Sequence, residues 1–276
     1  MDYCTFVFYK LLRMPRYFIE VSYKGTTYSG FQVQEVVRTV QGELERVMAV
    51  YARESIGLTG SSRTDGGVHA RQNFFHFDTK EEIKGDWVYH LNAMLPEDLA
   101  VRGIYRVPEE AHCRFDAVSR EYVYSIYRRK DPFMGGWGWR YPYPLEGGLL
   151  QQAAQLVQGE HDFSAFCKRG VQVKNFVCRV EESVWEQVGE QWVYRVRANR
   201  FLRGMVRSLV GGMVRVGRGQ LPMMEWVDLL EGRAAGAVRW LAPAEGLVLQ
   251  RVRYGGKLGH IIGEGEKETA TKEESE

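Results

Sequence analysis

The order of strand-like and helix-like segments constrains the fold of this chain most strongly. Seven segments have the alternating or short apolar pattern of β-strands: residues 17–23, 74–77, 101–107, 121–128, 176–185, 192–198 and 247–254. Four segments repeat apolar residues at helical spacing: residues 40–51, 87–94, 149–157 and 202–216. A parallel sheet needs a helix between successive strands, and this strict alternation is absent. The order therefore predicts an α+β fold.

The segments fall into two similar halves, each of which contains strands and helices. We place the junction around residues 108–118 and predict an N-terminal domain over 16–112 and a C-terminal domain over 113–262. Residues 1–15 are predicted to be a dispensable extension, because Met14 offers a second start just before the first strand. The basic residues of this extension follow its apolar patch, which is the reverse of a secretory signal.

The end of the chain differs in composition from the rest. Residues 263–276 contain six Glu, two Lys and no large apolar residue. Such a segment cannot bury a core, so we predict a disordered acidic tail. The formal net charge of +2 at pH 7 includes −4 from this tail, so residues 1–262 carry +6. A moderately basic body is compatible with a polyanionic partner.

Composition and motifs exclude several classes of protein. Hydrophobic residues make up 45% of the chain and no apolar run approaches the roughly 20 residues of a membrane-spanning helix. The cysteines show no C-x-x-C spacing: Cys4, Cys113, Cys167 and Cys178. This pattern argues against a zinc site or a disulfide framework and favours a location in the reducing cytoplasm. Nothing matches a Walker loop, a dinucleotide fingerprint, or a serine or cysteine nucleophile motif.

The segment from Arg63 to Gly67 combines a cation, a hydroxyl and a carboxylate just before two glycines. One interpretation is an ordinary turn, in which Asp65 bonds to the backbone two residues further on. The other is a carboxylate at a strand-to-turn corner, where the glycines let a substrate approach the backbone closely. Arg63 would then contact phosphate and Asp65 would face the reacting group. Spacing alone does not decide between them.

Arginines follow in the second half of the chain. Arg203 and Arg207 fall on one face of the last predicted helix, away from its apolar stripe. A solvated basic face is the commoner arrangement. The alternative places one of these arginines beside the Asp65 carboxylate, where it would hold the carboxylate ionised. Arg195 and Arg197 alternate on a predicted strand and would point to one side, as a phosphate-tracking surface does.

Aromatic residues and histidines have a structural and a functional interpretation. The tyrosines of the strand at 121–128 are expected to be packing residues, although one could offer its ring to a flipped base. The loop at 134–144 is rich in Gly, Pro and aromatic residues, and we favour packing or an interface over base stacking. Four histidines are widely spaced and lack carboxylate companions: His69, His76, His112 and His161. We therefore expect structural hydrogen bonds from them and no metal.

Several longer motifs stand in order along the body of the chain. They are Tyr23-Lys24-Gly25-Thr26-Thr27-Tyr28-Ser29-Gly30-Phe31-Gln32-Val33-Gln34, Thr39-Val40-Gln41, Ser62-Arg63-Thr64-Asp65-Gly66-Gly67-Val68-His69-Ala70, Asn92-Ala93-Met94-Leu95-Pro96, His112-Cys113-Arg114-Phe115, Arg120-Glu121-Tyr122-Val123-Tyr124, Gly159-Glu160-His161-Asp162-Phe163, Asn199-Arg200-Phe201-Leu202-Arg203-Gly204-Met205-Val206-Arg207 and Ala242-Pro243-Ala244-Glu245-Gly246-Leu247. This ordered set closely resembles the TruA family of tRNA pseudouridine synthases over roughly residues 16–256.

The resemblance implies the pseudouridine synthase fold, with two α+β halves whose antiparallel sheets join side by side and an active-site cleft between the halves. It implies isomerisation of uridine to pseudouridine at positions 38, 39 and 40 in the anticodon arm of tRNA, without a cofactor. It also implies a cytoplasmic homodimer. The moderately basic charge of residues 1–262 agrees with an RNA substrate but does not by itself predict one.

The resemblance also assigns roles to residues. Asp65 corresponds to the catalytic aspartate, and Arg207 to the arginine that pairs with it. Tyr122 corresponds to the tyrosine that contacts the substrate base, and Arg63 to the arginine beside the aspartate, engaged in base flipping or with phosphate. Whether Asp65 adds to the base, attacks C1′ or removes the C2′ proton stays open.

Two other classes of protein remain as alternatives. The first is an RNA-binding module without chemistry, in which the basic strand and helix provide the whole function. The second is a carboxylate-based nucleoside or glycoside hydrolase. Glycosidases generally need two carboxylates that flank the bond. The central motif offers only Asp65, and the next acidic residues in sequence, Glu54 and Asp78, have no motif-like setting.

Overall fold

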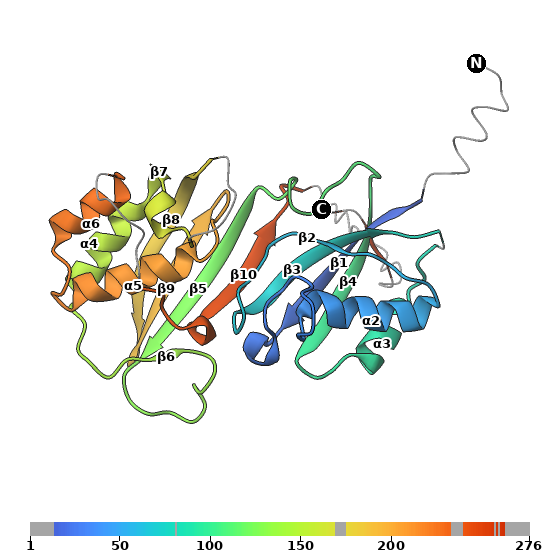
Figure 1. The fold of residues 1–276 in the computed structure, drawn as a ribbon, viewed down its shortest axis with the longest axis horizontal. Helices are drawn as coiled ribbons and strands as arrows, with labels where there is room; N and C mark the ends of the chain where they lie inside the picture. The colour runs from blue at the N-terminus through green and yellow to red at the C-terminus, as the bar shows by residue number, and fades with distance from the viewer. Residues whose placement is uncertain are drawn as a thin grey trace, which may run out of the picture.

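A computed structural model describes residues 14–80, 82–168, 175–232, 240–256, 258 and 260–262. One long sheet runs through the molecule, and the helices form two groups in front of it (Figure 1). The strands of the first half are β1 (Arg16–Tyr23), β2 (Thr59–Gly60), β3 (His69–Asp78) and β4 (Leu99–Val107). Those of the second half are β5 (Ser119–Tyr127), β6 (Trp139–Arg140), β7 (Gly159–Asp162), β8 (Val177–Val188), β9 (Gln191–Ala198), β10 (Leu247–Arg253) and β11 (His260–Ile262).

The strands form an eleven-stranded sheet in the order β11-β4-β1-β3-β10-β5-β9-β8-β7, with β2 paired to β3 and β6 to β5. Nearly all neighbours are antiparallel, and the α+β prediction is confirmed. The two halves meet where β10 pairs in parallel with β3 and antiparallel with β5. In this register Val248 lies beside His69, so the start of β3 is fixed against the second half.

The chain passes from the first half to the second between β4 and β5. After β10 it returns to the first half, where the short strand β11 pairs with β4. The predicted division at residues 112 and 113 lies between β4 and β5, in a segment of turns. The predicted extension and acidic tail fall on residues 1–13 and 263–276, which lie outside the described residues.

Helices α2 (Val40–Ala52) and α3 (Trp87–Met94) cover the first half, and α4 (Gly147–Val157), α5 (Met205–Gly217) and α6 (Met223–Leu230) cover the second (Figure 1). On α2 the buried residues are Val40, Leu44, Val47 and Met48, which is the predicted apolar face. Amphipathic spacing therefore located this helix correctly. In the described part of the chain, no helix has the length and apolar character needed to cross a bilayer.

The helix α5 differs from the prediction in two ways. It begins at Met205 and not at Leu202, because Gly204 has φ +74°, a left-handed conformation that cannot lie inside the helix. Arg203 therefore precedes the helix and is exposed. The helix is also buried on almost every side, and not only along one stripe. The prediction that Arg203 and Arg207 share a solvated helix face is wrong.

Candidate active site

The loop that carries Asp65 lies between β2 and β3 and is held by backbone hydrogen bonds to residues 28–31. Asp65 forms an isolated antiparallel bridge with Gly30. The backbone N–H of Phe31 donates to the carbonyl of Thr64 at 3.2 Å, and that of Gly67 donates to the carbonyl of Tyr28 at 3.3 Å. The first two long sequence motifs therefore meet in space, and the position of Asp65 is fixed on both sides.

Buried hydrogen bonds hold the neighbouring side chains inward. The hydroxyls of Thr64 and Tyr23 lie 2.8 Å apart, and the amide of Asn73 donates to Tyr23 at 3.2 Å and to the carbonyl of Ser62 at 2.8 Å. Burial raises the pKa of Tyr23 to about 12, so its hydroxyl stays protonated near neutral pH. Sequence reasoning missed this network, although Thr64 and Tyr23 both lie in the motifs that carry the family resemblance.

The backbone conformation of Gly67 explains why the loop has a second glycine. Its φ is +82°, a conformation that costs any other L-residue roughly 1 kcal/mol or more. A Cβ atom at this position would also approach the Cβ of Ala244 to 3.1 Å. The chain therefore turns sharply two residues after Asp65 and passes close to η3 (Ala244–Gly246), a 3-10 turn of the second half.

Arg207 lies in the first turn of α5 and forms an ion pair with Asp65. Its Nη1 donates to the carboxylate Oδ2 at 2.9 Å, and each of the two side chains is 19% exposed. Its Nε donates to the carbonyl of Ala242 at 2.7 Å, which fixes the guanidinium from the other side. Of the two arginines considered from sequence, Arg207 is the one beside Asp65. The pair is partly open to solvent, so a ligand can reach it.

Tyr122 lies on β5 with its ring buried and perpendicular to that of Phe201, at a centroid distance of 5.1 Å. Burial raises the pKa of Tyr122, and the negative charge of Asp65 raises it further. Among the described residues its hydroxyl has no hydrogen-bond partner. A neutral donor near Asp65 is therefore free to meet a ligand.

Arg63 is placed differently from the other three predicted residues. Its side chain is exposed, and within the described ranges it forms no ion pair or hydrogen bond. The structure brings Asp65, Arg207 and Tyr122 together and leaves Arg63 on the solvent side of the same loop.

His69, four residues after Asp65, connects the loop to both halves. Its Nδ1 accepts a hydrogen bond from the backbone N–H of Gly25 at 2.9 Å, and its Nε2 lies 3.2 Å from the carbonyl of Glu245. Burial lowers the pKa of His69, which favours this neutral form. The ring of Trp137 stacks on the imidazole at 4.7 Å. The expectation of a structural histidine agrees with these contacts, and so does packing in the loop at 134–144.

The basic strand β9 does not present free cations. Arg195 pairs with Glu186 of β8 at 3.0 Å, and Arg197 pairs with Glu181 and Glu182 at 3.1 Å each. The phosphate-tracking interpretation of these two arginines is wrong, because the hairpin register supplies each of them with a carboxylate.

Comparison with known proteins identifies the family. A family model described as tRNA pseudouridine synthase matches residues 19–116 and 153–255. The tRNA pseudouridine synthase A of Parabacteroides distasonis is 38% identical over 244 residues, which cover 87% of this chain and 96% of the relative. The enzymes of the same name from Porphyromonas gingivalis and Staphylococcus aureus are 37% and 36% identical, over 87% and 86% of this chain and 98% and 91% of their own lengths. The chain belongs to the tRNA pseudouridine synthase family.

Membership in this family makes the protein an isomerase that acts on uridine in tRNA. The TruA resemblance and the pseudouridine synthase fold are therefore confirmed. Both matched segments contain parts of the site, since Asp65 lies in the first and Arg207 in the second. A binding module without chemistry does not describe such a protein.

A second cluster in this tRNA pseudouridine synthase lies where the linker between β4 and β5 passes the end of β3. The side-chain N and S atoms of His76, His112 and Cys113 all lie within 4.8 Å of one another. Wide spacing in the sequence therefore did not keep these residues apart in the fold, and that argument was wrong. The Cys113 thiol donates to the carbonyl of Thr59 at 3.1 Å, and burial raises its pKa to about 12. The backbone N–H of Cys113 donates to Nδ1 of His76 at 3.4 Å. We interpret these residues as a hydrogen-bonded core cluster.

This cluster predicts that the folded protein loses stability in acid. Burial, with the charges of His112 and Arg16, lowers the pKa of His76 to about 4, whereas an unfolded histidine titrates near 6.5. Below about pH 6.5, His76 binds a proton in the unfolded chain but not in the folded chain. The stability that neutral His76 contributes is therefore complete above that pH and is lost as the pH falls towards 4. The free energy of unfolding falls by up to about 1.4 kcal/mol per pH unit.

Urea unfolding between pH 7.5 and 4.5 measures this effect. The His76→Gln variant is expected to be less stable at pH 7.5 and to lose stability less steeply in acid than the unaltered protein. His161→Gln, in the edge strand β7, is the control and is expected to keep the original slope. Equal slopes for the unaltered protein and His76→Gln would contradict the prediction.

Proposed function

We propose that this enzyme converts uridine to pseudouridine at positions 38, 39 and 40 of tRNA, in the anticodon arm, with Asp65 as the catalytic carboxylate. The observation that carries the proposal is the ion pair between Asp65 and Arg207 at the junction of the two halves. The pair is partly exposed, and the hydroxyl of Tyr122, which has no hydrogen-bond partner among the described residues, lies close enough to Asp65 for the carboxylate to raise its pKa. A carboxylate with a charge partner and an unused donor nearby is typical of a reactive site.

The chemistry needs few groups. The bond between C1′ and N1 of the uridine breaks, the ring turns, and a bond forms between C1′ and C5. N1 gains a proton and C5 loses one, so atoms and electrons balance without a co-reactant. An ionised carboxylate can attack C1′, add to the base, or remove the C2′ proton. In each route Arg207 supplies the counter-charge of Asp65 and directs one of its oxygens.

The target base lies in a stem or at its end, so it must leave the helix to reach Asp65. Unstacking costs a few kcal/mol, and stacking on an aromatic ring offsets part of this cost. We assign that role to Tyr122, whose raised pKa makes its neutral hydroxyl a hydrogen-bond donor to the base. In the same step Arg63, which is exposed and unpaired among the described residues, engages the backbone phosphate or the space that the base leaves.

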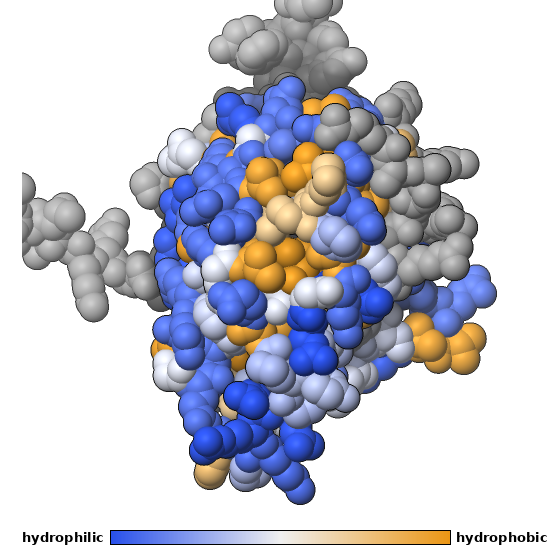
Figure 2. Space-filling model, turned by 90° about the vertical axis from the view of Figure 1, so that its left-hand side faces the viewer, coloured by the Kyte–Doolittle hydropathy of each residue, from blue (hydrophilic) through white to orange (hydrophobic). Residues whose placement is uncertain are grey.

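The assembly belongs to the same proposal. We propose a cytoplasmic homodimer, with the division at residues 112 and 113 separating two domains around each cleft. Figure 2 shows an apolar patch on the end of the molecule formed by the second half. At this end Met224 of α6 is 77% exposed and Leu156 of α4 is 40% exposed. An exposed apolar patch among polar residues is typical of a protein interface.

A pseudouridine map of treated tRNA tests the function. Unmodified tRNA transcripts with uridine at 38, 39 or 40 are incubated with the protein, and pseudouridine is located by chemical labelling and mass spectrometry. Conversion at these positions, and its loss when each uridine is replaced with cytidine, is expected. Pseudouridine elsewhere would overturn the assignment of position. Release of free uracil would instead support the hydrolase alternative.

A further inference from the structure

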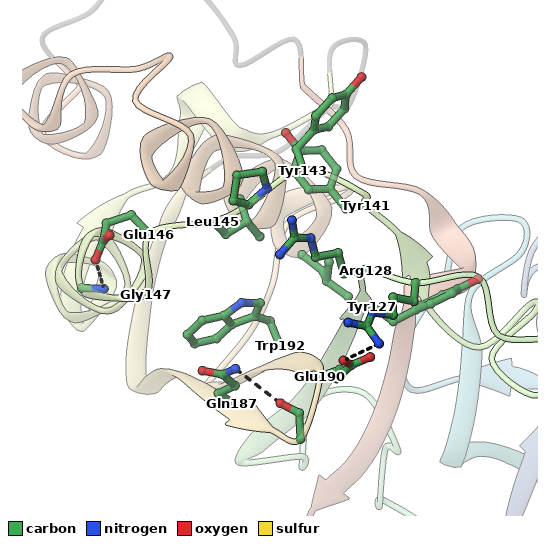
Figure 3. A pocket seen from close by; sticks show the side chains of 15 residues that line it. Tyr127, Arg128, Tyr141, Tyr143, Leu145, Glu146, Gly147, Gln187, Glu190 and Trp192 are labelled. Atoms are coloured by element: carbon green, nitrogen blue, oxygen red, sulfur yellow. Dashed lines mark hydrogen bonds and ion pairs between the residues drawn. The ribbon is translucent and has the colours of Figure 1, made fainter.

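A cleft lies at the end of β5 that is farther from Tyr122. It has a volume of about 640 Å³ and is lined by residues of β5, the β8–β9 hairpin, and the segment that leads into α4. Figure 3 shows the side chains of Arg128, Tyr141 and Trp192 around the open space, with Tyr143 at its rim. Aromatic rings and a guanidinium are the groups with which proteins hold single-stranded nucleic acid.

The lining of the cleft offers one arginine to an anion. The carboxylate of Glu190 pairs with Arg129 at 3.3 Å, and that of Glu146 lies at the start of α4, where it accepts from the N–H of Gly148 at 3.2 Å. Arg128 donates only to the carbonyl of Pro142, at 3.3 Å, and has no carboxylate partner in the described part of the chain.

A further cation stands behind the rim of the cleft. The guanidinium of Arg218 lies over the ring of Tyr143 at 4.5 Å. Its Nε is buried and has no hydrogen-bond partner among the described residues. Among the described residues, Arg128 in the lining and Arg218 behind the rim have no carboxylate partner, and both lie next to rings that can stack.

The cleft faces the same side of the sheet as the active site. Tyr122 and Ile126 alternate on one face of β5, and Trp192 lies opposite Ile126 in the β5–β9 register. The five residue-to-residue steps from Tyr122 to Tyr127 span about 17 Å of extended strand. At a rise of about 3.4 Å per stacked nucleotide, this distance corresponds to about five nucleotides.

The helix α5 and one loop connect the two places. Arg207, in its first turn, contacts Asp65, and the carbonyl of Gly217 at its other end accepts from the N–H of Glu146 in the cleft at 2.9 Å. The loop that follows Arg128 at the cleft reaches the active site, where Trp137 stacks on His69. The same helix and the same loop thus contact both the cleft and the active site.

We propose that this cleft binds a single-stranded segment of the tRNA substrate, about five nucleotides from the uridine that is isomerised. Bases stack on the rings of Trp192 and Tyr143, and Arg128 contacts a phosphate. This inference rests on the proposed function, because the substrate must place a target uridine at Asp65 and unpaired nucleotides within that distance. The loop of an anticodon arm has both.

Binding to a fluorescent anticodon stem-loop tests the proposal. The measurement is made by anisotropy in the Asp65→Asn protein, so that no turnover occurs. Arg128→Glu is expected to weaken binding at least about tenfold, and Arg128→Ala to lower the salt dependence of log Kd by about one unit. Arg46→Glu, on α2 of the other half, is the control for charge reversal and is expected to change Kd less than twofold. Equal Kd values for Arg128→Glu and Arg46→Glu would overturn the proposal.

A second variant tests stacking without reversing a charge. Tyr143 is 55% exposed, so Tyr143→Ala is expected to fold, as thermal melting will verify. A stem-loop with abasic loop nucleotides should bind the unaltered cleft more weakly than the ordinary stem-loop. This penalty should shrink in Tyr143→Ala, and an unchanged penalty would refute stacking. Because no turnover is measured, failure here is distinct from failure of the pseudouridine map.

Discussion

Asp65→Asn is expected to lower the rate of pseudouridine formation by at least about 10⁴-fold, because an amide can neither act as the nucleophile nor accept the proton. The substitution keeps the shape of the side chain and its ability to accept a hydrogen bond from Arg207. Binding of tRNA should therefore remain within a few fold of the unaltered protein. Nucleoside chromatography of treated tRNA measures the first effect, and anisotropy with labelled tRNA measures the second.

Asp78→Asn is the matched control for this experiment. Asp78 pairs with Arg16 at 2.8 Å, as Asp65 pairs with Arg207, but it lies at the other end of β3. The Arg16 guanidinium lowers the pKa of Asp78, so Asp78→Asn should reduce stability modestly at neutral pH, and the difference should fade as the pH falls below the ordinary carboxyl pKa of about 4. Pseudouridine formation should persist. A pseudouridine peak of normal size with Asp65→Asn would show that another group performs the chemistry.

Local patterns predicted the elements whose residues contact near neighbours in sequence. The helix α2 has one apolar face, and the β8–β9 hairpin closes at Gly189, so periodicity and turn chemistry located both. The junction between the halves could not be found in this way. It depends on β10 pairing with β3, which joins Val248 to His69, two residues that lie far apart in the sequence.

The same limit applies to the site. The ion pair joins residues 142 positions apart, and helical spacing alone left Arg203 and Arg207 as equal candidates. Gly204 decides between them, because its left-handed backbone starts α5 after Arg203. The carboxylates that neutralise Arg195 and Arg197 depend on strand register, which alternation does not fix. The ordered motifs pointed to Asp65, Arg207 and Tyr122, and only the fold shows how these three residues meet.

Arg207→Ala is expected to lower the rate of pseudouridine formation by about 10²- to 10³-fold, which is typical for the loss of one charged partner in a partly buried site. Without the guanidinium, the carboxylate of Asp65 loses its counter-charge and the hydrogen bond that directs its Oδ2. Nucleoside chromatography of treated tRNA measures the loss of rate.

Arg207→Lys separates charge from geometry. An ammonium group keeps the positive charge but cannot make both the contact with Asp65 and that with the carbonyl of Ala242, which Arg207 contacts at 2.9 Å and 2.7 Å. We expect this variant to recover only part of the rate of the unaltered protein. Arg16→Ala removes the matched arginine of the Asp78 pair and should leave the rate unchanged at a temperature where the protein is folded. If Arg207→Ala had the original rate, the ion pair would be structural, and Asp65 would owe its reactivity to another neighbour.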